Sequence, residues 1–399
     1  MTIETARGKR DVVMPSRPPI WNNPDARAIF YQVLVVAVVV GLAAYLIRNT
    51  MDNLHRQSIA TGFSFLDREA GFGIGEHLIP FSPADTYGRA LLVGLLNTVY
   101  VAVIGIVCAT IVGTVVGICR LSSNWLIRKV SQIYVELFRN IPLLLQLFFW
   151  YKLLNENAPG PRQAWHLIPN VFVSNRGIMF PVPAPDPSHE WMWVAFAVGI
   201  VVSVVIGRWA KRRQMATGRQ FPTGIVSAGL IIGLPLIVFL ATGANLTLDK
   251  PELRGFNFAG GETLSPEFAA LLLGLVIYTA SFIAEIVRAG ILAVSWGQTE
   301  AASALGLTRG QTLRLIVLPQ ALRVIVPPMT SQYLNLTKNS SLAVAIGFPE
   351  LVSVGNTTIN QTGQAIEGIA IIMGVYLLIS LLISAFMNWY NSHVRLVER

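Results

Sequence analysis

Residues 300–319 read EAASALGLTRGQTLRLIVLP, a compact and polar stretch that lies between two strongly apolar runs. The stretch opens on small side chains, has Gly306 near its middle and closes on Leu318-Pro319. A chain this apolar keeps such an insert only where it meets water or another protein. The rest of the sequence has to show which of the two applies.

The local pattern of this stretch predicts two short helices joined by a turn. EAASAL is helical in pattern with Thr299 as its expected cap, and an acid in a first turn suits the helix dipole. Gly306 permits a sharply turned backbone, and a second helix is expected from Thr308. Pro319 is expected to break the chain where the next apolar run begins. The small residues favour close approach by another protein, and a loop lying against lipid headgroups is the alternative.

The composition of the whole chain indicates the class of protein to which this stretch belongs. Of 399 residues, 53% are hydrophobic and 13% are charged, about half the charge of a soluble chain, and the mean hydropathy is +0.56. Uncharged runs of about 18–29 residues can cross a hydrocarbon core of ~30 Å as helices. We therefore predict an all-α polytopic membrane protein with about eight transmembrane helices, at 28–48, 90–119, 133–153, 191–208, 224–242, 267–294, 319–337 and 364–388.

The net charge of +9 does not indicate a nucleic-acid partner, because the basic residues form no stripe with interleaved aromatics. They gather between apolar runs, in 1–27, 120–129, 208–219, 309–314 and 395–399. Eight spans place all of these on one side, which the positive-inside rule makes the cytoplasm. Both termini and residues 300–319 are then cytoplasmic. Of the opposite loops, 154–190 is expected to be irregular, and 243–266 has strand and turn signals.

Catalytic and metal-binding patterns are missing from the sequence. Cys108 and Cys119 have no metal-ligand spacing, and the five histidines are scattered. A membrane-bound enzyme is therefore disfavoured. An ion-coupled secondary carrier remains the alternative to an ATP-driven transporter. It is disfavoured because five of the eight spans have no acid in their interiors and because it gives residues 300–319 no role.

The spacing within the quoted stretch resembles that of a known family. It reproduces the pattern EAA-x3-G-x9-I-x-LP of ABC importer permeases, through Glu300, Ala301, Ala302, Gly306, Ile316, Leu318 and Pro319. The flanks 281–302, 318–329 and 336–352, with 95–117 and 134–147, resemble the polar amino acid permeases of the histidine and glutamine type. The enlarged chain is most similar to the Q-type permease subunit of general L-amino acid (Aap and Bzt) transporters.

The resemblance covers about 90–153 and 265–390, and it implies a five-helix permease core with additions. The additions are a first transmembrane helix with a periplasmic loop (28–89) and an inserted segment with two transmembrane helices (154–264). A cytoplasmic N-terminal segment (1–27) and a cytoplasmic tail (391–399) complete the chain. One extra leading helix moves the N-terminus inside, and two inserted helices preserve the sidedness of the later spans.

The same resemblance implies a function and a set of partners. A permease of the bacterial inner membrane would import polar L-amino acids from the periplasm by alternating access. Its EAA loop would couple it to two copies of a cytoplasmic ATPase, beside a second homologous permease and a periplasmic amino-acid-binding protein. The chain has no G-x-x-x-x-G-K-[ST] sequence, so ATP and Mg²⁺ belong to the partner ATPase and no cofactor is expected on this chain.

Charged residues inside spans mark candidate contacts with the substrate, because each costs roughly 2.5–3.5 kcal/mol on insertion scales. Two Glu–Arg pairs at i, i+3 share a helix face: Glu136 with Arg139, and Glu285 with Arg288. The first pair is expected to neutralise itself near the inner surface. Glu285, with Tyr278 and Ser281 on its face, either neutralises Arg288 or accepts the substrate ammonium in the pathway.

Three further polar or proline positions interrupt the apolar pattern. Lys338, Asn339, Ser340 and Ser341 either contact a substrate carboxylate from unwound backbone or form the outer end of the seventh span. Pro142 and Gln146, like Pro327-Pro328, are expected to shape their helices rather than contact substrate, since proline removes a backbone hydrogen bond and kinks a helix.

Overall fold

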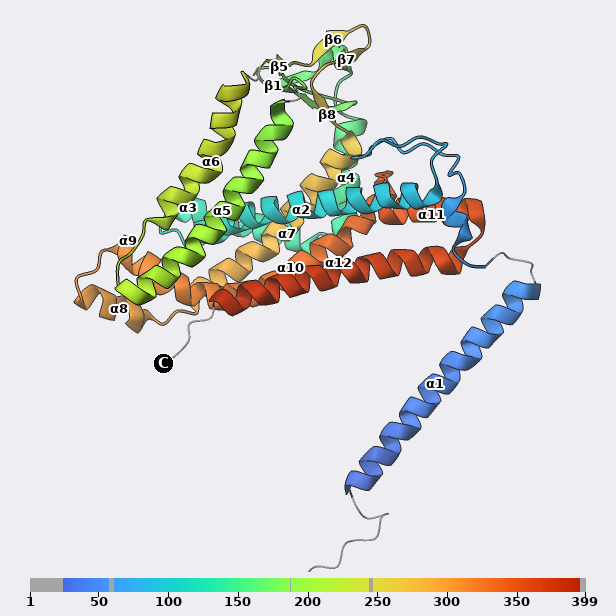
Figure 1. The fold of residues 1–399 in the computed structure, drawn as a ribbon, viewed down its shortest axis with the longest axis horizontal. Helices are drawn as coiled ribbons and strands as arrows, with labels where there is room; N and C mark the ends of the chain where they lie inside the picture. Colours follow the sequence, from blue (N-terminus) through green and yellow to red (C-terminus); the bar gives the residue numbers. More distant parts are fainter. Residues whose placement is uncertain (1–23, 57–60, 187, 244–246, 395–399) are drawn as a thin grey trace, which may run out of the picture.

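The computed structural model describes residues 24–56, 61–186, 188–243 and 247–394 and shows a helical membrane protein (Figure 1). Within these residues, seven helical segments are long and apolar enough to span a membrane, and a bent helix pair makes an eighth if the pair counts as one span. The predicted all-α membrane fold with about eight transmembrane helices is thus confirmed. The long helices are α1 (Pro24–Arg56), α2 (Tyr87–Cys119), α5 (Ser188–Thr217), α6 (Thr223–Thr242), α7 (Pro266–Leu292), α10 (Leu318–Asn339) and α12 (Ala365–Val394).

The third predicted span is not straight. It consists of α3 (Trp125–Asn140) and α4 (Leu143–Asn155), whose axes differ by 105°. The break falls at Ile141 and Pro142, because the residue before a proline is disfavoured in the helical region. Ile141 accordingly has extended backbone angles.

Shorter helices lie between the long ones. They are α8 (Trp296–Ala304), α9 (Arg309–Thr312), α11 (Leu351–Thr362), a π-helix (Leu313–Val317) and 3₁₀ helices at Ser64–Asp67, Pro161–Gln163 and Ser340–Ile346. The helix α11, which follows the seventh span, was not predicted. Its twelve residues pack between α2 and α12.

The core of the molecule is the contact between α2 and α7, and α10 packs against both of these helices. Gly113 and Gly117 of α2 make this contact close. A Cβ atom added at Gly113 would lie 2.6 Å from the Ile283 side chain, and one added at Gly117 would lie 2.7 Å from the Ala284 carbonyl. Small residues allow such approach in membranes, where van der Waals packing holds helices together.

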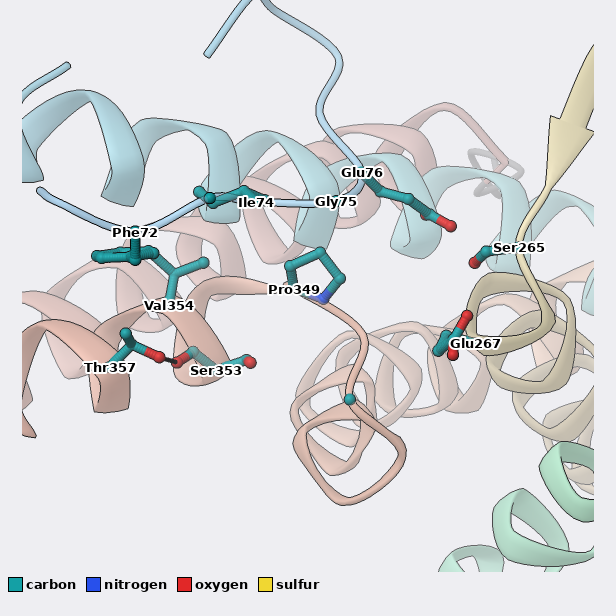
Figure 2. A pocket seen from close by; sticks show the side chains of 12 residues that line it. Phe72, Ile74, Gly75, Glu76, Ser265, Glu267, Pro349, Ser353, Val354 and Thr357 are labelled. Carbon is teal, nitrogen blue, oxygen red and sulfur yellow. Dashed lines mark hydrogen bonds between the residues drawn. The ribbon is translucent and has the colours of Figure 1, made fainter. Parts of the chain in front are cut away.

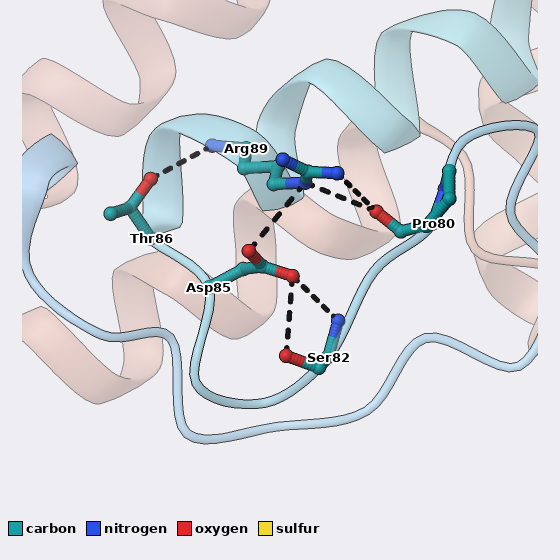
Figure 3. Close-up of polar contacts among 5 residues, drawn as sticks. All are labelled: Pro80, Ser82, Asp85, Thr86 and Arg89. Carbon is teal, nitrogen blue, oxygen red and sulfur yellow. Dashed lines mark hydrogen bonds and ion pairs between the residues drawn. The ribbon is translucent and has the colours of Figure 1, made fainter.

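The start of α2 is held by a polar cluster in the loop before it (Figure 3). The Thr86 hydroxyl accepts a hydrogen bond from the Arg89 N–H and so caps the helix. The Arg89 guanidinium donates to the Pro80 carbonyl at 2.6 and 3.1 Å. The Asp85 carboxylate lies 3.6 Å from Arg89 and accepts from the Ser82 N–H. These contacts order the loop over the end of α2.

The inserted segment contains strands, so the expected irregular loop at 154–190 is wrong. A four-stranded antiparallel sheet has the order β1-β2-β3-β8, and β4 pairs with β5 and β6 with β7. The strands are β1 (Trp165–Ile168), β2 (Val171–Ser174), β3 (Gly177–Phe180), β4 (Val182–Pro183), β5 (Leu248–Asp249), β6 (Glu252–Arg254), β7 (Asn257–Ala259) and β8 (Glu262–Leu264). The last four of these strands, β5 to β8, confirm the strand signals predicted in 243–266.

The sheet joins the two loops that flank the α5–α6 hairpin. Ile178 of β3 pairs with Leu264 of β8, and the Ala184 N–H donates to the Thr247 carbonyl at 2.8 Å. Both loops therefore lie at the same end of the molecule, as the span count requires. In Figure 1 the strands stand at the opposite end of α7 from α8 and α9.

Candidate functional site

The elbow, which we define as residues 296–319, projects beyond the end of α7 (Figure 1). The helix α8 begins at Trp296 after Ser295, so the expected cap at Thr299 is wrong. Glu300 lies in the second turn and accepts a hydrogen bond from the Trp296 indole N–H at 2.9 Å. The helix therefore starts one turn earlier than EAASAL alone indicates.

Gly306 closes α8 in a left-handed conformation with φ +76. The Gly306 N–H donates to the Ser303 carbonyl and the Leu307 N–H to the Ala302 carbonyl, which is a Schellman ending. Thr308 then caps α9 in a reciprocal box with Gln311. Backbone hydrogen bonds fix one end of the turn and the side chains of Thr308 and Gln311 fix the other, so the elbow has a defined shape.

Pro319 does not break the chain, contrary to expectation. The helix runs from α9 through the π-helix into α10, and the Leu318 N–H donates to the Leu313 carbonyl five residues before it. The wider π turn accommodates the proline, which has no N–H to offer the ladder. The elbow is therefore continuous with the membrane helix α10.

The seven residues of the EAA pattern differ in exposure. Ala302 is buried against the elbow itself, and Ile316 and Pro319 are partly buried, whereas Glu300, Ala301, Gly306 and Leu318 are exposed. Two large apolar side chains beside them are more exposed still, Leu305 at 80% and Trp296 at 74%. A small and partly apolar surface is thus free on the elbow.

A second site lies at the same end of α2 and α7, where Glu285 has two arginine partners. The Arg288 guanidinium donates to Oε1 at 2.6 Å, and the Arg120 guanidinium bonds Oε2. In the sequence, Arg120 indicates only the side of the membrane on which its loop lies. No local spacing links Arg120 to Glu285, because the two residues belong to different helices.

Glu136 and Arg139 do not form the expected ion pair. Glu136 accepts from the Gln132 side chain at 2.7 Å, and the Arg139 guanidinium lies over the Phe282 ring, 4.9 Å from its centre. With Glu285 these side chains surround a cavity of about 440 Å³, which we call the inner cavity. It is lined by Arg120, Val135, Glu136, Arg139, Asn140, Phe282 and Glu285.

Tyr278 and Ser281 do not line the inner cavity. Ser281 is fully buried, and its hydroxyl donates to the Tyr278 carbonyl at 2.6 Å. The Tyr278 ring packs on Phe282 at 5.0 Å between centres. Of the three residues predicted on this face, only Glu285 reaches the cavity.

The break between α3 and α4 is closed by amide side chains. Gln146 donates through Nε2 to the carbonyls of Phe138 and Ile141, each at 3.0 Å. The Asn140 side chain donates to the Glu136 carbonyl at 2.8 Å. The two Gln146 bonds replace the helical partners that the carbonyls of Phe138 and Ile141 lose at the break before Pro142. Pro327 and Pro328, by contrast, lie inside the continuous helix α10.

Residues 338–341 lie at the end of α10, where it passes into a 3₁₀ helix, so of the two alternatives the structure agrees with the end of the seventh span and not with unwound backbone. Lys338 is exposed and Asn339 ends α10. The Ser340 hydroxyl, fully buried, donates to the Thr337 carbonyl, and the Ser341 hydroxyl donates to the Lys338 carbonyl. Both hydroxyls are thus engaged with their own helix.

An outer cavity of about 470 Å³ lies at the other end of the molecule, between the loop before α2, the start of α7 and α11 (Figure 2). Glu76, from the loop before α2, faces Ser265 and Glu267 at the start of α7. Burial raises the pKa of the Glu76 carboxyl, and the charge of Glu267 raises it further. No feature of the sequence singles out Glu76. It lies in a loop rather than inside a predicted span, and no charged residue lies three or four positions from it.

Glu350 is a second buried acid that sequence analysis missed. It is fully buried and caps α11 by accepting from the N–H groups of Val352 and Ser353, each at 2.8 Å. The Tyr376 hydroxyl donates to it from α12. Burial raises the pKa of this carboxyl to about 7.

Comparison with known proteins identifies relatives along nearly the whole chain. Residues 102–396 match the family described as "Binding-protein-dependent transport system inner membrane component". The putative amino-acid ABC transporter permease YhdX of Escherichia coli is 54% identical, over 94% of this chain and 96% of the relative. The general L-amino acid permease AapQ of Rhizobium johnstonii is 53% identical, over 94% of each chain. The glutamate/glutamine/aspartate/asparagine permease BztB of Rhodobacter capsulatus is 43% identical, over 94% and 95%.

Proposed function

Because this chain belongs to the family of binding-protein-dependent transport system inner membrane components, we propose that it carries polar L-amino acids across the bacterial inner membrane. The relatives named for general L-amino acids and for glutamate, glutamine, aspartate and asparagine support this substrate class. Transport would run from the periplasm to the cytoplasm by alternating access between two packings of the helices.

The observation that carries this proposal is the shape of the elbow. Its turn is fixed at both ends by hydrogen bonds, it exposes Trp296 and Leu305, and it continues into α10 without a break. A rigid surface of this kind docks into a groove of a separate ATPase. Movement of that groove on ATP binding is passed to α10 and, through the packing of α10, to α7 and α12.

The proposal assigns ATP and Mg²⁺ to two copies of this ATPase and none to the present chain. A second homologous permease completes the pathway, and a periplasmic amino-acid-binding protein delivers the substrate. The elbow end faces the cytoplasm, together with both termini, and the sheet end faces the periplasm. Residues 1–23 and 395–399, which form most of the two terminal segments, lie outside the described residues.

Purification from the native host tests the proposal. We expect an ATPase of about 250 residues, the size implied by the resemblance, to co-purify with the chain. The reconstituted complex should take up polar amino acids only when ATP and the binding protein are supplied. A chain that purifies alone and transports amino acids on an ion gradient without ATP would make it a secondary carrier instead.

A further inference from the structure

The α5–α6 hairpin has one end that the proposed function does not use. The two helices pack mainly on each other, and no residue of α6 is buried. The hairpin is therefore open to the surrounding lipid along most of its length. Its polar end, where α5 turns into α6, lies at the membrane surface.

The helix α5 reaches further than α6 towards the end of the molecule where α8 and α9 lie (Figure 1). It has 30 residues, whereas α6 has 20, and the bond between Ala184 and Thr247 joins the chain at the other ends of the two helices. Phe221, in the turn between the helices, reaches back to Trp209, with 5.6 Å between the ring centres. The last two turns of α5, after Trp209, therefore project beyond the rest of the hairpin.

This projecting end carries a group of basic residues that we call the basic tip. Its members are Arg208, Lys211, Arg212, Arg213 and Arg219, and all of them are exposed. In the parts of the chain that the structure describes, no ion pair includes any of them. Residues 191–248 contain no acidic side chain, so nothing within the hairpin balances these charges.

The dipole of α5 does not explain the basic tip. Cations stabilise a helix C-terminus only within about its last turn, and the last turn of α5 contains no basic residue. Arg208, Lys211 and Arg212 instead share one helix face at i, i+3 and i+4, where like charges destabilise the helix. The positive-inside rule requires cations on this side of the membrane but does not require them on one face. An anion that binds between the three side chains would relieve their repulsion.

The depth of the basic tip matches that of lipid phosphates. Trp191, at the outer end of α5, precedes Trp209 by about 27 Å of helix, close to the ~30 Å thickness of the hydrocarbon core. Tryptophan at both levels is typical of the two membrane surfaces. Lys211 and Arg212 lie about 3–5 Å beyond Trp209 along the axis, within the headgroup layer of about 5–8 Å. Arg213 stays at the same level, with its guanidinium 5.3 Å from the centre of the Trp209 ring.

We propose that the basic tip binds the phosphate groups of anionic phospholipids in the cytoplasmic leaflet. The inference uses the sidedness of the proposed function and goes beyond it, because it assigns a lipid site apart from the elbow and the inner cavity. Clusters of Lys and Arg next to a membrane helix are attracted to anionic headgroups. Phosphatidylglycerol supplies a phosphate with a net negative charge at this depth. Phosphatidylcholine supplies the same phosphate without a net charge.

The test measures which lipid gathers at the tip in nanodiscs that contain the purified complex of permeases and ATPase. A fluorophore is attached to Thr217→Cys in a background of Cys108→Ala and Cys119→Ala, and the signal of the same complex without Thr217→Cys is subtracted. Quenching by nitroxide-labelled phosphatidylglycerol is compared with quenching by nitroxide-labelled phosphatidylcholine at equal lipid fraction. We expect phosphatidylglycerol to quench more strongly, and the difference to decrease in high salt, which screens exposed charges.

A triple variant and its matched control show whether the charges of the tip cause this preference. Arg208→Gln, Lys211→Gln and Arg212→Gln together should remove most of it. One basic residue near an anionic surface changes lipid affinity roughly fivefold, and three change it roughly a hundredfold. The control combines Arg208→Lys, Lys211→Arg and Arg212→Lys, which keeps all three charges and should keep the preference.

Three outcomes would overturn the inference. The first is equal quenching by the two lipids in the wild type, or an unchanged preference in the glutamine variant. The second is loss of the preference in millimolar inorganic phosphate, since the tip would then bind a soluble anion. The third is a glutamine variant that keeps the lipid preference and loses the ATPase, since the tip would then be a protein-binding surface. None of these measurements needs uptake, so absent ATP-driven uptake with an intact lipid preference would count against the proposed function alone.

Discussion

In the proposed function, coupling to the ATPase depends on Gly306. Its φ of +76 is a conformation that costs other residues about 1–2 kcal/mol, and no atom of the chain lies within 4 Å of where its Cβ would stand. A larger side chain therefore projects outward from the elbow. We expect Gly306→Trp to leave membrane insertion intact and to uncouple ATP hydrolysis from uptake, measured side by side in proteoliposomes.

Gly218 provides the matched control for this change. It also has a positive φ, +69, with open space around it, but it lies between α5 and α6 and is not part of the elbow. The variant Gly218→Trp should carry the same backbone strain and transport normally. Full uptake in Gly306→Trp would show that the elbow does not dock.

Glu350 makes stability depend on pH. Its pKa is raised from 4.5 to about 7 by burial, so the folded state binds the proton more tightly than the unfolded state does. The stability from this residue is therefore fully present below about pH 4.5 and is lost as pH rises through about 7, by roughly 3 kcal/mol in total.

The variant Glu350→Gln removes this titration. We expect the midpoint of thermal unfolding of the complex to fall from about pH 5 to about pH 8 in the wild type and to change much less in Glu350→Gln. Glu156→Gln, which alters an exposed carboxylate paired with Lys152, should keep the wild-type profile. Parallel pH profiles for Glu350→Gln and the wild type would refute the assignment.

The charged residues show what sequence spacing can predict and what it cannot. The i, i+3 spacing correctly predicted an ion pair between Glu285 and Arg288. The same spacing predicted a pair between Glu136 and Arg139, which the structure does not contain. A spacing defines a helix face, whereas the partner depends on the rotamer and on the neighbouring helix. Arg120, the second partner of Glu285, comes from α2, and only the folded packing of α2 on α7 reveals it.

At the scale of the element, the bend between α3 and α4 depends on Gln146. Its amide satisfies two carbonyls at the break and is almost fully buried. We expect Gln146→Leu, which is similar in size, to destabilise the complex by about 1–3 kcal/mol, since buried carbonyls without partners carry this cost. Thermal unfolding in detergent measures the effect.

The control for this change is Gln214→Leu on α5. Gln214 is exposed, and its loss should leave stability unchanged within about 0.5 kcal/mol, as for surface substitutions elsewhere. Equal stability of the Gln146 and Gln214 variants would mean that the break needs no amide to hold it.

Most helices were predictable because long apolar runs leave a chain few options in a membrane. Predicted and observed boundaries of α2, α6, α7 and α12 agree within a few residues, apart from the longer C-terminal end of α12. The 105° bend was not predictable in size, because Pro142 indicates a break but not its angle. In 154–190 the local pairs β1–β2 and β2–β3 were missed although they lie close in the sequence, and the pairing of β3 with β8 was not predictable because the α5–α6 hairpin separates these strands.

For the whole molecule, the α5–α6 hairpin is a separable unit. The two helices pack mainly on each other, and the backbone that enters and leaves the hairpin is joined by the bond between Ala184 and Thr247 at 2.8 Å. We expect replacement of residues 185–246 by a short Gly-Ser linker to preserve insertion, sidedness and assembly with the ATPase. Two spans are removed together, so the elbow keeps its side.

A reporter fused after residue 394 and co-purification of the ATPase measure this outcome. The control removes α5 alone, an odd number of spans, and should reverse the reporter or abolish assembly. If the excised chain also loses the ATPase, the hairpin contributes to the core after all.

The pairing of β3 with β8 has a consequence for biogenesis. When β3 leaves the translocation machinery, its partner strand has not yet been synthesised, and it arrives only after both inserted helices have been threaded. If only one of the two helices crosses the membrane, β8 lies on the opposite side of the bilayer from β3. The edge of β3 that pairs with β8 then has no partner. Closure of the sheet between β3 and β8 therefore requires that both inserted helices have crossed the lipid.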